Sequence, residues 1–117
     1  MARSRASAKQ AGARFERQVA DYLRDMLNIR EVDRMVKTGR GDKGDVSNVR
    51  DSQGRLIAVE CKNVQQQALP QWTREAQREA HNYGAHVGVV VHKRHRNGQM
   101  GEQWVSMTLD DLIKLLS

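Results

Sequence analysis

The sequence contains little cysteine and no long hydrophobic run, and these two absences exclude several classes of protein. Only one of its 117 residues is a cysteine, Cys61, so neither a disulfide-stabilised scaffold nor a zinc site built on several cysteines is possible. No apolar run is long enough to cross a membrane. The basic N-terminal residues lead into an amphipathic pattern rather than into the apolar core of a signal peptide. We therefore expect a soluble, cytoplasmic protein.

Several binding motifs are also incomplete. The glycine-rich segment 38–44 lacks the terminal Gly-Lys-Ser/Thr of a nucleotide-binding P-loop. His92 and His95 have the spacing of a zinc-binding pair, but no further soft ligands are spaced to complete a site, and contact with phosphate is the better interpretation of this loop. There is no internal repeat and no low-complexity tract, and the length fits a single domain, which we place at residues 13–117.

Acidic residues are outnumbered by basic ones. The 20 Lys and Arg against 14 Asp and Glu give a net charge of +6, which by itself indicates solubility as readily as a polyanionic partner. The distribution is more informative, because the bases cluster in residues 1–14, 34–43 and 93–96. This clustering predicts contact with nucleic-acid phosphates. The candidate DNA-binding residues are Arg3, Arg5, Lys9, Arg14, Arg40, Lys43, Lys93, Arg94 and Arg96.

The hydrophobic pattern predicts an α/β sandwich. Residues 1–12 lack an apolar period and are expected to form a flexible basic arm. From Ala13 to Asn28 apolar residues recur at helical spacing, which predicts an amphipathic helix. The remaining predicted elements are strands over 31–37, 45–50, 55–62, 85–93 and 103–107 and helices over 70–83 and 108–116. The apolar run 87–91 is typical of a central strand that is covered on both faces.

Two carboxylates and an amine are placed where a hairpin brings them together. Asp45 opens the strand 45–50, and Val59-Glu60-Cys61-Lys62 lies in the strand that returns antiparallel to it. Alternate side chains of a strand share a face, so Glu60 and Lys62 point the same way and Cys61 points to the opposite, apolar side. The alternative is an ordinary exposed Glu and Lys pair on a strand, which is common.

Two further acidic residues compete for a role. Asp42 also follows a glycine, but it lies in the loop, whereas Asp45 opens an apolar strand and is favoured. Glu16 falls inside the apolar stripe of the first helix if each residue advances by about 100°. A buried, unpaired Glu is costly, so Glu16 needs a metal or a Lys as partner, or a position at the rim of the face where it pairs with an Arg.

This set of residues suits metal-dependent hydrolysis of a phosphodiester. Mg²⁺ prefers hard oxygen ligands and keeps several waters, so two carboxylates and a backbone carbonyl suffice to hold it. The ion can provide an attacking hydroxide, neutralise charge and assist the leaving oxygen. Asp45 and Glu60 are the candidate ligands. Lys62 is a candidate to orient or deprotonate the attacking water or to bind the phosphate.

Gly44-Asp45-Val46, followed after a β-turn by Val59-Glu60-Cys61-Lys62 and preceded by a helix with Glu16, resembles the PD-(D/E)XK nuclease superfamily. Within it, the chain is similar over almost its whole length to Holliday junction resolvases, both archaeal ones and small resolvase-like proteins of actinobacterial phages. The proline that usually precedes the first Asp is Gly44 here.

The resemblance implies a restriction-endonuclease-like three-layer αβα sandwich with a central mixed β-sheet. It implies that Glu16, Asp45 and Glu60, with the backbone carbonyl of Cys61, hold Mg²⁺, for which Mn²⁺ substitutes, and that Lys62 is the catalytic lysine. It further implies a homodimer that makes paired nicks in four-way DNA junctions during recombination and repair, in the host cytoplasm if a phage encodes it. The alternatives are another nicking or end-processing nuclease of phage replication, repair or packaging, and a catalytically silent DNA-binding module.

Overall fold

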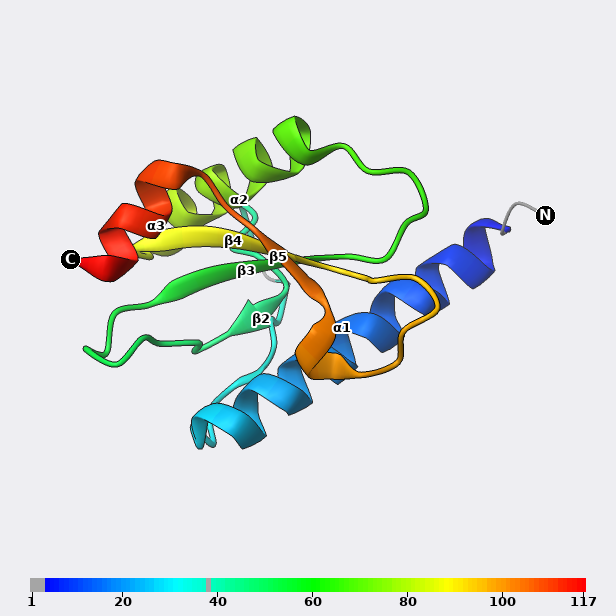
Figure 1. Cartoon of the computed structure of the whole chain (residues 1–117), viewed down its shortest axis with the longest axis horizontal. Coiled ribbons are helices and arrows are strands. Elements are labelled where there is room, and N and C mark those ends of the chain that lie inside the picture. Colours follow the sequence, from blue (N-terminus) through cyan, green and yellow to red (C-terminus); the bar gives the residue numbers. More distant parts are fainter. Residues whose placement is uncertain (1–3, 38) are drawn as a thin grey trace.

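A five-stranded mixed sheet forms the middle layer of the computed structural model, which describes residues 4–37 and 39–117 (Figure 1). The strand order is β1-β2-β3-β4-β5; β3 and β4 are parallel and the other neighbours are antiparallel. In chain order the elements are α1 (Arg5–Leu27), β1 (Asp33–Arg34), β2 (Val46–Ser47), β3 (Ile57–Lys62), α2 (Leu69–Tyr83), β4 (Val87–His92), a 3₁₀ turn (Met100–Glu102), β5 (Trp104–Ser106) and α3 (Leu109–Leu116). The predicted α/β, restriction-endonuclease-like αβα fold is confirmed.

Helix α1 covers one face of the sheet. Phe15 and Val19 are almost fully buried and belong to one apolar cluster with Val59, Val87 and Val89 of the central strands. Because alternate residues of a strand face opposite ways, these positions of β3 and β4 all point toward α1. The main core therefore lies between α1 and the sheet.

Helix α2 covers the opposite face. Trp72 and Ala76 pack on Val90, and Trp72 is only 5% exposed. The backbone of α2 approaches β4 closely, since a Cβ on Gly88 would lie 2.1 Å from the carbonyl oxygen of Ala76. Glycine at this position therefore lets the helix lie directly on the sheet, as the apolar pattern of a doubly covered strand predicts.

The helix α1 begins earlier than predicted. The predicted start at Ala13 is wrong, because the helix begins at Arg5. Ser4 is the N-cap residue, and its side chain accepts a hydrogen bond from the backbone N–H of Ser7 at 3.1 Å. Such an N-cap satisfies one of the free N–H groups of the first turn, so a polar sequence without an apolar period can still be helical. Residues 5–12 thus belong to α1, whereas Arg3 lies outside the described residues.

The predicted strands are shorter than expected, and two of them retain only two residues each. The strand over 45–50 is reduced to Val46–Ser47 because Asn48 adopts a left-handed conformation, with φ 65°, which interrupts the ladder. Pairing resumes in a single bridge between Arg50 and Leu56. The strand over 31–37 is reduced to Asp33–Arg34 at the sheet edge.

The last helix begins where the pattern predicts it, and the structure shows Thr108 as its N-cap, whose side chain accepts a hydrogen bond from the N–H of Asp111 at 3.2 Å. The Asp111 carboxylate in turn accepts the N–H of Gly88 at 3.4 Å, next to the part of β4 that β5 does not reach. Among the helices of the described residues, none combines the length and apolarity of a membrane span.

Candidate active site

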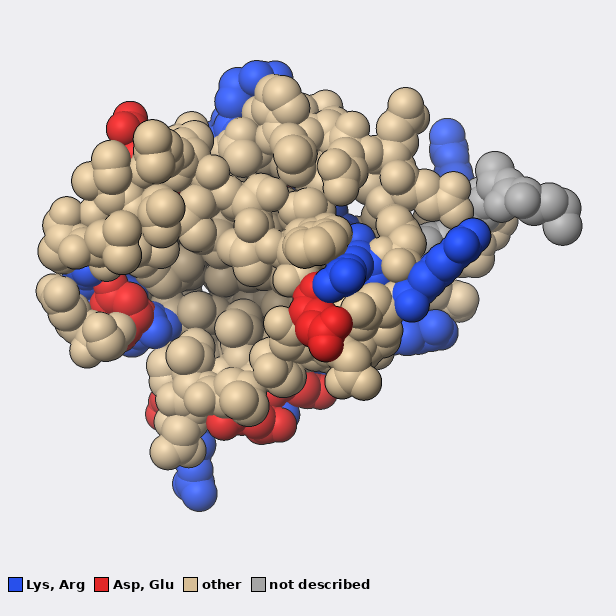
Figure 2. All heavy atoms as spheres, viewed as in Figure 1, with Lys and Arg blue, Asp and Glu red and all other residues tan. Residues whose placement is uncertain are grey.

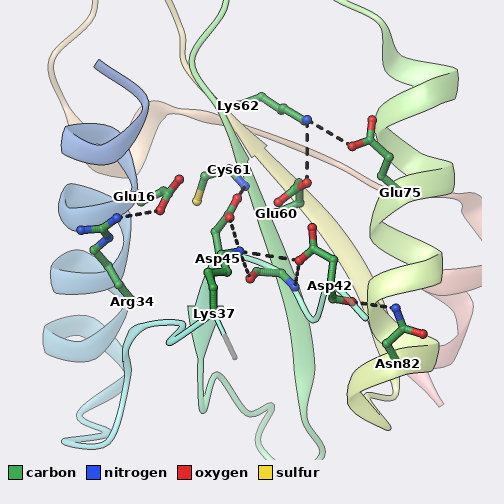
Figure 3. Close-up of polar contacts among 11 residues, drawn as sticks. Glu16, Arg34, Lys37, Asp42, Asp45, Glu60, Cys61, Lys62, Glu75 and Asn82 are labelled. Carbon is green, nitrogen blue, oxygen red and sulfur yellow. Dashed lines mark hydrogen bonds and ion pairs between the residues drawn. The ribbon is translucent and has the colours of Figure 1, made fainter. Parts of the chain in front are cut away.

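Asp45, Glu60 and Lys62 come together near the C-terminal end of β3 (Figure 3). Lys62 Nζ lies 3.7 Å from Glu60 Oε2, on the face that α2 covers. Cys61 points to the opposite face, where it packs against the α1 core. The predicted alternation of these three side chains is confirmed.

The carboxylate of Asp45 is held by two donors. Lys37 Nζ lies 2.9 Å from Oδ1, and the backbone N–H of Cys61 donates to Oδ2 at 2.8 Å. The same ammonium of Lys37 also donates to the carbonyl of Gly44 at 2.7 Å. Asp45 thus lies between β2 and β3, with its side chain fixed relative to the strand that carries Glu60 and Lys62.

The residue before Asp45 must be glycine for a local reason. Gly44 has φ 99°, and a Cβ there would lie 2.8 Å from the carbonyl oxygen of Val59. Its lack of a side chain lets the N–H of Asp45 donate to that carbonyl at 2.7 Å. The replacement of the usual proline by Gly44 is therefore consistent with the close approach of this loop to β3.

Three more carboxylates, those of Asp42, Glu75 and Glu79, lie close to Glu60 or Lys62. Oxygen atoms of Asp42, Glu60 and Glu79 all lie within 4.8 Å of one another. Glu79 is 2% exposed, and within the described part of the chain neither of its carboxylate oxygens has a hydrogen-bond partner. Glu75 Oε2 lies 3.3 Å from Lys62 Nζ. Such a surplus of close carboxylates fits a site for a divalent cation, since oxygen-rich, negatively charged groups are what Mg²⁺ requires.

Crowding of the acids shifts their pKa values. Burial, followed by the neighbouring Asp45, raises the pKa of Glu60 to about 10. Burial and Asp42 raise the pKa of Glu79 to about 7. Burial opposes ionisation of Asp45 as well, but hydrogen bonds from the Glu60 carboxyl, the Cys61 N–H and Lys37 lower its pKa overall. Without a cation, the group therefore retains protons at pH values at which ordinary carboxyls have lost them.

Lys62 remains an ammonium in this environment. Burial alone would lower its pKa, but the carboxylates of Glu60 and Glu75 raise it above the ordinary value. A protonated lysine is a hydrogen-bond donor and a positive charge rather than a base. Of the three roles considered for Lys62, this arrangement favours orienting water or binding phosphate over deprotonating the water.

Glu16 lies on the other side of Asp45, toward α1 and Cys61 (Figure 3). Its Oε1 is 3.3 Å from the guanidinium of Arg34, so it has the arginine partner that was one of the alternatives for this residue. Burial and the charge of Asp45 nevertheless raise the pKa of Glu16. The two carboxylates are thus electrostatically linked, although Glu16 and Glu60 approach Asp45 from different faces of the sheet.

The backbone of Cys61 is also directed toward this group. Its N–H bonds to Asp45 on the β2 side of β3, whereas the next carbonyl, of Lys62, accepts the N–H of Lys93 on the β4 side. The N–H and carbonyl of one residue in a strand point to the same side, so the Cys61 carbonyl also faces Asp45. This is the direction in which a backbone ligand would have to point.

Exposed bases lie on two of the segments that carry acids of the site, α1 with Glu16 and the loop with Asp42. Arg5, Lys9 and Arg14 are exposed on the first half of α1, and Figure 2 shows Lys and Arg gathered at the end of the molecule where α1 begins. Arg40 and Lys43 are exposed in the loop that carries Asp42. The acids of the candidate site thus adjoin basic segments that can face a phosphate backbone.

The loop after β4 is hydrogen-bonded to the segment that follows β3. His95 is hydrogen-bonded to the Val64 carbonyl at 2.9 Å, and Asn63, which directly follows Lys62, donates to the carbonyl of Ala11 in α1 at 3.4 Å. The loop's own bases are ordered: Lys93 donates to the carbonyls of Arg94 and Asn97, and the Arg94 guanidinium lies 4.6 Å from the ring centre of Trp104. Arg96 is exposed.

Sequence reasoning missed Lys37, Glu75 and Glu79, and it ranked Asp42 behind Asp45. One signal for Glu79 was present, because it falls among Ala76 and Ala80 in the apolar stripe of α2 just as Glu16 does in α1. For Lys37 there was none, since its position depends on how the loop before β2 folds back.

Comparison with models of protein families gives a match over residues 7–116 to the family described as "Phage putative PDDEXK endonuclease". The match spans nearly the whole chain and includes Glu16, Asp45, Glu60 and Lys62. It supports the PD-(D/E)XK superfamily but does not distinguish a Holliday junction resolvase from other nucleases of that superfamily. No significant match was found among curated proteins or solved structures.

Proposed function

The chain belongs to the family of phage PDDEXK endonucleases, and on that premise we propose that it is a metal-dependent, structure-selective DNA endonuclease that acts as a Holliday junction resolvase. The observation that carries this proposal is the convergence of Asp45, Glu60 and Lys62 at the end of β3. The exposed bases on α1 and in the loop before β2 support DNA as the substrate.

In this proposal Asp45, Glu60 and the Cys61 carbonyl hold Mg²⁺, or Mn²⁺ in its place, and Glu16 acts on the centre through its electrostatic link to Asp45. When bound, the ion acts as a Lewis acid on the scissile phosphate and lowers the pKa of a bound water. The buried positions of Asp45 and Glu60, 8% and 6% exposed, match this role because carboxylates are stabilised there by a cation.

The side chains of the protein have separate tasks in the proposed reaction. The ammonium of Lys62 donates hydrogen bonds to the scissile phosphate or to the attacking water, on the same face as Glu60. Lys37 holds Asp45 in position from the other side. Bases on α1, in the loop before β2 and in the loop after β4 bind the DNA backbone and read the shape of the junction rather than the bases.

Resolution of a junction requires two nicks on opposed strands, and a two-fold symmetric homodimer supplies two active sites in suitable orientation. We therefore propose that the active form is a dimer, working in the cytoplasm of the host cell on recombination or repair intermediates.

The test is cleavage of a synthetic four-way junction, a flap and a linear duplex of the same sequence, with Mg²⁺ or with EDTA. We expect paired nicks in the junction with Mg²⁺ only, and no cleavage by Asp45→Asn or Glu60→Gln. Glu31→Gln changes an exposed acid that forms no ion pair among the described residues, and this control should cleave like the wild type.

The alternatives give different results in the same assay. Equal cutting of plain duplex would contradict the resolvase and favour an end-processing or nicking nuclease. Tight junction binding by a wild-type protein that never cleaves, with either metal, would indicate the silent binding module.

A further inference from the structure

A group of three carboxylates lies on the α2 side of the candidate site and shares Glu60 with the residues assigned above. Asp42 comes from the loop before β2, Glu60 from β3 and Glu79 from α2, and one oxygen of each lies within 4.8 Å of the others. Oxygens bound to one cation at about 2.1 to 2.5 Å are separated by no more than about 4 to 5 Å. The three side chains are therefore already spaced as ligands of a single ion.

Glu79 supplies an independent indication of a ligand. It is 2% exposed, lies on the face of α2 that packs on the sheet, and both of its carboxylate oxygens are buried without a hydrogen-bond partner among the described residues. A buried carboxylate is strongly disfavoured unless it is paired or bound to a metal. The fold thus holds at this point a buried acid for which a cation is the missing partner.

The lysines of the site pair with Asp42 and Glu60 and with acids outside the group, but not with Glu79. Lys37 Nζ lies 2.9 Å from Asp45 and 3.6 Å from Asp42, and Lys62 Nζ lies 3.3 Å from Glu75 and 3.7 Å from Glu60. In the described part of the chain no ion pair reaches Glu79. Glu79 is therefore the member of the group that has no ion-pair partner among the described residues.

We propose that Asp42, Glu60 and Glu79 form a second divalent-cation position, which shares Glu60 with the position assigned to Asp45, Glu60 and the Cys61 carbonyl. This inference rests on the proposed function in that it takes the first position to be the nuclease centre. Asp42, with its side chain 56% exposed, gives the ion access to solvent and room for the waters that Mg²⁺ retains. Two ions so arranged are the equipment of hydrolases that stabilise both the attacking and the leaving oxygen of a phosphodiester.

The test is a titration of the full chain with Mn²⁺, in which free ion is followed by its electron paramagnetic resonance signal, without DNA. We expect two ions per wild-type chain and one per Glu79→Gln chain, with the affinity of the lost site reduced at least about tenfold. Asp42→Asn, on an exposed loop where it does not disturb the core, should lose the same ion. Glu75→Gln, one turn earlier on the same helix, should still bind two.

The outcomes separate this inference from the proposed function. A single wild-type ion that is lost in Asp45→Asn and retained in Glu79→Gln would overturn the second position and leave the nuclease proposal intact. Loss of an ion in Glu75→Gln as well would overturn the assignment to these three carboxylates. Two ions, one of them dependent on Glu79, in a chain that cleaves no DNA would support the second position and refute the nuclease.

Discussion

The ammonium of Lys37 lies 2.9 Å from the carboxylate of Asp45 and at the same time donates to the carbonyl of Gly44, so one side chain fixes both the acid and the loop that carries it. Among the described residues Lys37 forms ion pairs with Asp45 and Asp42 but not with Glu60, and it acts through Asp45 as a positioning residue. This relationship could not be anticipated from the sequence.

Replacement of Lys37 by Met should slow junction cleavage by about 10-fold to 100-fold, the equivalent of one charge-assisted hydrogen bond. The loss should fall on kcat, because Asp45 then samples unproductive orientations, while junction affinity changes little. Lys37→Arg, which restores the charge and the donor, should recover most of the rate. Full activity of Lys37→Met, or no recovery with Arg, would contradict the positioning role.

The stability of the metal-free protein should fall as pH rises above about 5. Glu60 has a folded-state pKa of about 10 against an ordinary value of 4.5, and Glu79 has one of about 7. Between the ordinary and the raised pKa the folded state binds more protons than the unfolded state, so stability is full below the ordinary value and is lost as pH rises through this window.

Glu60→Gln removes this dependence in part. At pH 8 in EDTA the variant should be more stable than the wild type by at least about 1 kcal/mol, since each unit of pKa shift corresponds to about 1.4 kcal/mol. Thermal unfolding at pH 5, 6.5 and 8 measures the effect, and Mg²⁺ should restore wild-type stability at pH 8. Parallel pH profiles of the two proteins would show that Glu60 is not the destabilising group.

Gly44→Ala should destabilise the fold by about 1 to 3 kcal/mol, because a side chain there is strained and must displace the backbone of Val59. The same substitution at Gly98, where an added Cβ meets nothing within 4 Å, is the matched control and should change stability by less than about 0.5 kcal/mol. Urea unfolding of both variants measures these changes in the free energy of unfolding. Equal stability of Gly44→Ala and wild type would mean that the loop moves freely away from β3.

Exposed bases on the first half of α1 should contribute to DNA binding through phosphate contacts. Arg5→Ala and Lys9→Ala should each weaken junction binding uniformly across sequences and reduce the slope of log affinity against log salt by about one unit. Binding is measured with the Glu60→Gln protein as background so that no cleavage intervenes. Arg24→Ala, at the other end of the same helix and paired with Asp21, should leave the slope unchanged.

Sequence reasoning located the elements whose signal is local. The amphipathic stripe around Phe15 and Val19, the end of α2 at Tyr83 and the start of the last helix at Thr108 all depend on neighbours within a few residues, and the structure has each of them as predicted. The start of α1 was placed too late because its first turns carry no apolar stripe and begin at a polar cap, Ser4.

By itself, the sequence determined the fold class and the face that Glu60 and Lys62 share, because helix and strand periods dictate which side chains align. Only the tertiary structure decided that Lys37 fixes Asp45 and that Glu79 lies buried beside Asp42 and Glu60. Lys37 reaches Asp45 because the loop before β2 folds back on itself. Glu79 reaches Glu60 through the packing of α2 on the sheet, which the absence of a side chain at Gly88 permits, and no local pattern encodes such an approach.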